Sequence, residues 1–135
     1  MSVVHETAVG LRLRGDDLDP HTISALLGAK PTLAAARNEI WHTPNGKAVV
    51  ANQGFWHFGT ERSRPGDLDL QITRISSKLT DDLVIWQQLT SRYESDLFCG
   101  LFLSESNRGI SIKPETLAMA GQRGLLLDLD IYRQD

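Results

Sequence analysis

A strand, a turn and a capped helix follow one another near the start of the chain, and this unit constrains the fold more than any other feature. Between residues 8 and 14 apolar and polar side chains alternate, which is the pattern of a half-buried strand. Asp19 is a good N-cap residue, and Pro20 suits the first helical position because its missing N–H would have no helical partner there. Gly28 suits the left-handed residue that ends a helix. The sequence therefore predicts a strand followed directly by a short helix.

The middle and the end of the chain contain further elements of both kinds. Residues 39–60 are typical of β structure, with a tight turn at Asn45-Gly46 and a strand around Phe55–Phe58. Apolar spacing over 68–89 predicts helix in two pieces, with a break near 77–80. The later segments are predicted to be a strand over 97–103, a short strand over 110–112, a helix that begins at Pro114 and a closing strand over 125–132.

This order, β-α-β-β-α-α-β-β-α-β, is typical of an α+β fold. We expect a mostly antiparallel, mixed sheet with the helices packed mainly on one face. The first part, β-α-β-β-α-β, has the order of a ferredoxin-like unit. With 135 residues, the chain is near the commonest size for one domain, so we expect a single globular domain over residues 1–135.

Composition argues against several classes of function. The net charge is −3 and the acidic and basic residues are well mixed, which disfavours nucleic acid as a partner. Cys99 is the only cysteine, so the chain has neither an internal disulfide nor a cysteine-based zinc site. No signal-peptide pattern and no apolar run of about 18 residues is visible, so we expect a cytoplasmic location and no membrane partner. No motif predicts a cofactor.

Two groups of carboxylates are candidates for chemistry. Asp16, Asp17 and Asp19 could offer oxygen ligands to a hard cation, but turn formation and helix capping explain them better. Asp128 and Asp130 alternate with apolar residues on the last strand and could do acid–base work if burial separates their pKa values. A polar strand face that meets water is the simpler interpretation, and no metal site is predicted.

The dipeptides Trp41-His42 and Trp56-His57 repeat one pattern on two predicted strands. Histidines that lie opposite each other could share a metal, but aromatic packing with exposed histidines is favoured. An alternative hypothesis places Trp41, Trp56, His57 and Arg62 around a pocket for a small ligand at the sheet edge or at a dimer interface. Cys99, flanked by apolar residues, is expected to be an inert buried thiol.

Four segments together resemble a known family. They are the helix start Arg14–Pro20, the strand Gly54–Trp56, the segment Asp96–Gly100 and the closing Leu127–Tyr132. In this order and spacing they resemble the bacterial family catalogued as domain of unknown function 4279, over nearly the whole chain. The resemblance implies a single small domain and carries no established activity or catalytic residues.

Three functions remain open from the sequence. The leading hypothesis is a non-enzymatic protein-interaction module, for example of an immunity or toxin-neutralising type, because no residue cluster has the pattern of a catalytic site. Its partner would be another protein or a second copy of the chain, and the acidic balance suits a basic protein. The small-ligand-sensing domain is the first alternative. A hydrolase-like enzyme that pairs His57 with Asp128 or Asp130 is the second.

Overall fold

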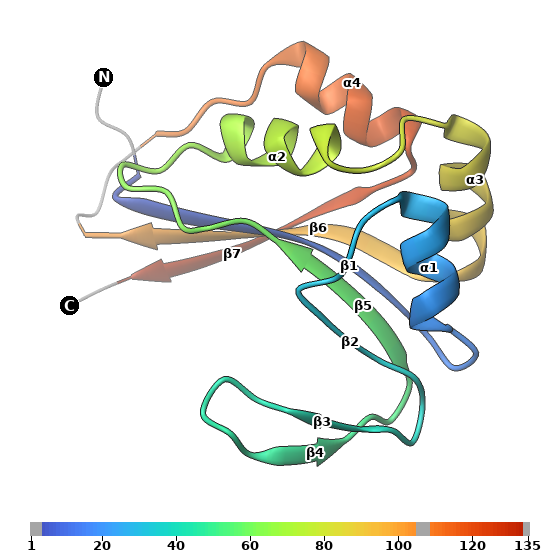
Figure 1. Ribbon diagram of the computed structural model, residues 1–135. Helices are drawn as coiled ribbons and strands as arrows, with labels where there is room; N and C mark the ends of the chain where they lie inside the picture. The colour runs from blue at the N-terminus through green and yellow to red at the C-terminus, as the bar shows by residue number, and fades with distance from the viewer. Residues whose placement is uncertain (1–3, 105–108, 134–135) are drawn as a thin grey trace.

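The computed structural model describes residues 4–104 and 109–133, which form seven strands and four helices (Figure 1). In chain order they are β1 (Glu6–Gly15), α1 (Pro20–Leu27), β2 (Leu33–Ala35), β3 (Ile40–His42), β4 (Ala48–Val50), β5 (Gly54–Gly59), α2 (Leu68–Ser77), α3 (Leu83–Arg92), β6 (Glu94–Leu103), α4 (Pro114–Gln122) and β7 (Leu126–Arg133). None of the helices in these ranges combines the length and the apolar character that a membrane crossing requires.

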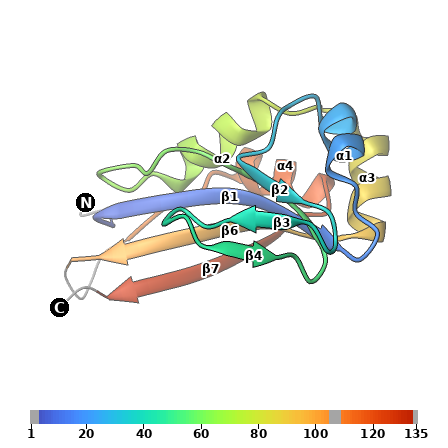
Figure 2. The same ribbon diagram turned by 60° about the horizontal axis from the view of Figure 1, so that its bottom comes forward.

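Five strands form one mixed sheet in the order β2-β5-β1-β6-β7, and β3 pairs with β4 in a separate hairpin. Only β6 and β7 run parallel, whereas the other neighbours in the sheet are antiparallel. The four helices lie on one face of the sheet, and the hairpin projects from the opposite face (Figures 1 and 2). The predicted α+β class, with a mixed sheet and its helices on one face, is confirmed.

The connections form two interlocked split β-α-β units. α1 joins β1 to β2, and β5 lies between these two strands, antiparallel to both. α2 and α3 join β5 to β6, and β1 lies between those two strands in the same way. This arrangement of β2, β5, β1 and β6 is that of a ferredoxin-like unit. β7 extends it by one strand, and the β3–β4 hairpin is an insertion between β2 and β5.

The caps of the helices explain their limits. Asp19 stands at the N-cap of α1, where its carboxylate accepts a hydrogen bond from Thr22 Oγ1 at 2.7 Å, and Gly28 ends the helix with φ 77°. α2 ends with Lys78 at its C-cap, and Asp82 begins α3 by accepting a hydrogen bond from the Val84 N–H at 2.9 Å. The predicted break between the two helical pieces is therefore confirmed.

Two local features differ from what the sequence predicts. Residues 33–35 form an edge strand that no pattern predicted, because pairing with β5 holds three small and apolar residues extended there. Residues 110–112 form no strand, since no strand of the described chain lies beside them to pair with. α4 packs on the core through Thr116 and Ala120.

The core lies between the helices and one face of the sheet. Odd-numbered residues of β1, such as Leu11 and Leu13, point into it and are fully buried. Trp56, opposite Leu13 in β5, and Trp86 of α3 are its largest side chains. Because strand side chains alternate, the even-numbered residues of β1 lie on the surface away from the helices. We name this surface the open face.

Candidate functional site

The open face gathers charged and aromatic side chains from four strands of the sheet. Strand register places Arg12 between His57 and Asp96, and the same alternation carries the face on to β7. Its residues are Arg12, Arg14, Phe55, His57, Glu94, Asp96, Phe98, Phe102, Asp128, Asp130 and Tyr132. The helices leave this side of the sheet uncovered, and the β3–β4 hairpin extends on this side from the ends of β2 and β5 (Figure 1).

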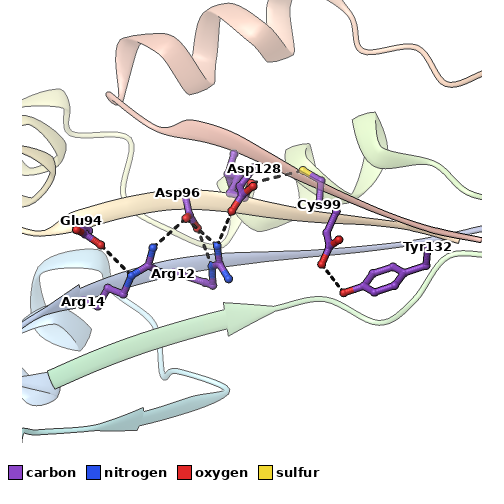
Figure 3. A network of polar contacts seen from close by, with 9 residues as sticks. Arg12, Arg14, Glu94, Asp96, Cys99, Asp128 and Tyr132 are labelled. Atoms are coloured by element: carbon purple, nitrogen blue, oxygen red, sulfur yellow. Dashed lines mark hydrogen bonds and ion pairs between the residues drawn. The ribbon is translucent and has the colours of Figure 1, made fainter. Parts of the chain in front are cut away.

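Arg12 is the centre of the polar contacts on this face (Figure 3). Its Nε and Nη2 donate to the two carboxylate oxygens of Asp96, both at 2.8 Å, and Nη2 also donates to Asp128 at 3.0 Å. Its guanidinium lies over the Phe98 ring, 4.6 Å from the centroid. Asp96 is only 3% exposed, so its carboxylate is shielded from water, and the two parallel hydrogen bonds hold Arg12 in one position.

Arg14, two residues after Arg12 on the same face of β1, has a similar set of contacts. Its Nε donates to Glu94 at 3.1 Å, and its Nη2 approaches Asp96 at 3.4 Å (Figure 3). Glu94 is largely exposed, so this pair is weaker than the Arg12–Asp96 pair. The two arginines therefore stand side by side, each held by carboxylates of β6.

A cavity of about 310 Å³ lies between the hairpin and the open face. Trp41 of β3 meets Phe55 edge-on with ring centroids 5.3 Å apart, and Phe55 lies 4.9 Å from His57. These rings form an aromatic wall beside the arginines. The lining residues are Arg12, Arg14, Leu33, Trp41, Val49, Val50, Asn52, Gln53, Phe55 and His57. The cavity combines flat apolar surface with guanidinium and carboxamide groups, which is typical of a site for an organic ligand.

His57 is the titratable group inside this cavity. Burial lowers its pKa below the usual 6.5, and the positive charges of Arg12 and Arg14 lower the pKa further, while Asp96 opposes this. The neutral imidazole is therefore favoured, with one ring nitrogen as a donor and the other as an acceptor.

The free energy of unfolding is expected to fall as the pH drops from about 6.5 through the lower pKa that His57 has in the folded chain. The unfolded chain protonates His57 more readily, so the contribution is fully present above the usual pKa and is lost below it. Urea unfolding between about pH 5 and pH 8 checks this. The variant His57→Gln should show a shallower pH dependence than the original chain, and parallel curves for the two would contradict the prediction.

The structure places the four sequence-predicted pocket residues in three locations. Trp41 and His57 line the cavity. Trp56 lies on the helix side of the sheet, where it is fully buried. Arg62 pairs with Glu6 at 2.5 Å and lies over Phe102, at the other end of the open face. Since Phe102 pairs with Glu6, six residues along β1 from Arg12, that end is about 20 Å away.

Two strands separate His57 from Asp128 and Asp130, which the sequence-based hypothesis pairs in a hydrolase-like site. His57 is on β5, both aspartates are on β7, and β1 and β6 lie between, a separation of about 14 Å. Arg12 binds Asp128, and Tyr132 Oη donates to Asp130 at 2.5 Å. The carboxylates are therefore out of hydrogen-bond reach of the imidazole.

The remaining residues that the sequence suggested for catalysis or metal binding lie outside the cavity. Cys99 is fully buried on the helix side, and burial raises the pKa of its thiol to about 11, so the reactive thiolate is strongly disfavoured. His42 belongs to β3, which pairs only with β4, so it does not lie opposite His57. Asp17 forms an exposed ion pair with Arg92 at 2.5 Å. Within the described ranges no cluster of three His, Cys, Asp or Glu side chains is arranged to hold a metal.

Sequence reasoning missed Arg12 and Arg14 as site residues. Their spacing of two on an alternating strand was a usable signal, because it puts both side chains on one face. Phe55, Asn52 and Gln53 carried no such signal, since their role depends on where the hairpin folds back.

The comparison with protein families gives one match. The family model described as "Domain of unknown function (DUF4279)" matches residues 5–134, essentially the whole chain. No curated protein and no solved structure matches the chain. The match includes every strand of the open face and the hairpin beside it. The chain therefore belongs to the DUF4279 family.

Proposed function

We propose that this chain is a non-enzymatic binding domain that takes a partner protein on the open face of its sheet. The observation that carries the proposal is the composition of that face. Phe98 and Phe102 are half-buried, and Tyr132 is 41% exposed, although no helix covers them. Exposed aromatic surface of this kind is typical of an interaction site.

The kinds of side chain on the open face support a protein as the partner. Aromatic residues and arginine are the types enriched in the buried centres of protein interfaces, and lysine is depleted there. Tyr132 stacks on Phe102 with centroids 4.8 Å apart, and the Arg62 guanidinium lies over the same ring at 4.6 Å from its centroid. The described positions of the open face hold no lysine. Its ion pairs are already formed, so docking would bury compensated charges.

Capture of a partner from the native host, with the tagged chain, tests this proposal. A protein recovered in fixed stoichiometry by the original chain should be recovered about tenfold less by Tyr132→Ala, because an interface tyrosine commonly contributes more than 1 kcal/mol. Val84→Ala on α3 is the matched control, since Val84 is 61% exposed on the helix side. Absence of any stoichiometric partner, or equal recovery by both variants, would overturn the proposal.

Two narrower forms of the proposal depend on what is captured. A toxin as the recovered protein would make the chain an immunity or toxin-neutralising protein. Self-association would appear instead as a dimer of the purified chain by light scattering, and Tyr132→Ala should then weaken that dimer.

A small-ligand-sensing domain is the second candidate function, and the cavity beside the hairpin favours it. Its volume of about 310 Å³ is at the lower end of the range for small-molecule sites.

A further inference from the structure

We propose that the hairpin cavity binds a carboxylate group attached to a flat aromatic ring. This inference goes beyond the proposed function, because it concerns the cavity beside the hairpin and names the chemistry that the cavity would recognise. The carboxylate would meet the guanidinium groups of Arg12 and Arg14, and the ring would lie against Trp41 and Phe55.

The arginines supply donors that the protein itself leaves unused. Nε and Nη2 of Arg12 donate hydrogen bonds to Asp96 and Asp128. The same two nitrogens of Arg14 donate to Glu94 and Asp96. Within the described chain no hydrogen bond uses Nη1 of either residue. Both side chains line the cavity and stand two residues apart on one strand. Neighbouring guanidinium donors are suited to the two oxygens of a carboxylate.

The local charge selects a singly charged ligand. The three carboxylates of Asp96, Glu94 and Asp128 outnumber the two guanidinium groups, so the group has no surplus of positive charge and a ligand with several negative charges would meet net repulsion. At the cavity itself the arginines are the nearer charges, because both line it and none of the three carboxylates does. Burial is the main cause of the lowered pKa of His57, and the further lowering by Arg12 and Arg14 agrees with a positive potential at this point.

The walls select a flat, apolar group next to the carboxylate. Trp41 and Phe55 meet edge-to-face, and Leu33, Val49 and Val50 complete an apolar surface. A third ring can add to an edge-to-face pair with favourable stacking geometry. Asn52 and Gln53 lie at the same cavity and can bond a polar substituent on the ring.

Two sources can present this chemistry, and the experiment separates them. A free aromatic acid is one source, and the C-terminal residue of a partner protein is the other when that residue is aromatic. Chemical-shift titration of the ¹⁵N-labelled chain would use indole-3-acetate, its neutral amide, and a short peptide ending in tryptophan with a free or amidated C-terminus. Indole-3-acetate or the free-acid peptide should shift the signals of Trp41 and of the β3–β4 hairpin. The matching neutral compound should bind at least tenfold more weakly. Binding by the small acid identifies a metabolite source, and binding by the peptide alone identifies a protein terminus.

Matched variants make the result specific to the cavity. Arg14→Gln and Trp41→Ala should each weaken the binding about tenfold or more. Arg74→Gln, an exposed arginine on α2, should leave it unchanged. Equal binding of acid and amide, full binding by Arg14→Gln, or no shift with any probe at millimolar concentration would overturn this inference. The capture experiment with Tyr132→Ala would still decide the proposed function, because Tyr132 does not line the cavity.

Discussion

Replacing Trp56 with alanine is expected to lower the free energy of unfolding by about 3–5 kcal/mol, the largest single effect we foresee. Trp56 is fully buried and stacks on Phe58 with centroids 5.9 Å apart. Its Nε1 donates to Ser24 Oγ at 3.0 Å, which ties β5 to α1. Truncation would leave a cavity between the sheet and α1 and remove this hydrogen bond. Urea unfolding followed by circular dichroism measures the loss.

Trp41→Ala is the matched control for this change. Trp41 belongs to the hairpin, is only half-buried, and has an edge-on contact with Phe55. Its removal is expected to cost about 1 kcal/mol. The two tryptophans should therefore separate stability from binding: Trp56→Ala unfolds the chain more easily, and Trp41→Ala mainly weakens binding at the cavity. A cost for Trp41→Ala as large as that for Trp56→Ala would contradict this division.

Gly54→Ala is expected to destabilise the protein by about 1–3 kcal/mol. A methyl group on Gly54 would lie 2.5 Å from the backbone oxygen of Leu18 and 3.0 Å from that of Gly15. Gly15 is the last residue of β1 and Leu18 lies in the turn before α1, and the Leu18 N–H donates to the Gly15 carbonyl at 3.2 Å. The clash is therefore with backbone that cannot rotate away. Thermal unfolding of the variant should give a clearly lower midpoint.

Gly121→Ala tests whether the effect is due to that close approach. Gly121 lies in α4, and a methyl group there meets no atom within 4 Å. Alanine has the higher helix propensity, so a gain of about 0.5 kcal/mol is expected. If the two glycine variants changed the unfolding midpoint in the same direction, the steric explanation for Gly54 would be wrong.

Features that depend on neighbours in sequence were predictable. Alternation along β1 depends on residues two apart, and the limits of α1 depend on Asp19, Pro20 and Gly28 alone. The break before α3 required only Asp82 and the residues beside it. The alternation of Asp128 and Asp130 along β7 was evident for the same reason. In each case the backbone preference acts within one or two turns of chain.

Features that depend on distant partners were not predictable. β2 is a strand because β5 lies beside it. Of the four residues expected at one pocket, Trp56 went to the core, since the odd-numbered residues of β1 and their partners in β5 face the helices. Arg62 forms an ion pair with Glu6 at the end of the open face that is distant from the cavity.

The sequence by itself determined that this protein has an α+β fold, where its first helix begins and ends, and which strand residues share a face, because these properties follow from local backbone preferences and side-chain alternation. Only the tertiary structure decided that Arg12 binds Asp96, 84 residues away, and Asp128, 116 residues away. It also decided that Trp41 lies beside the open face and lines a cavity next to the two arginines. Strand order and hairpin placement depend on how much apolar surface the whole chain buries, and a short segment does not determine that quantity.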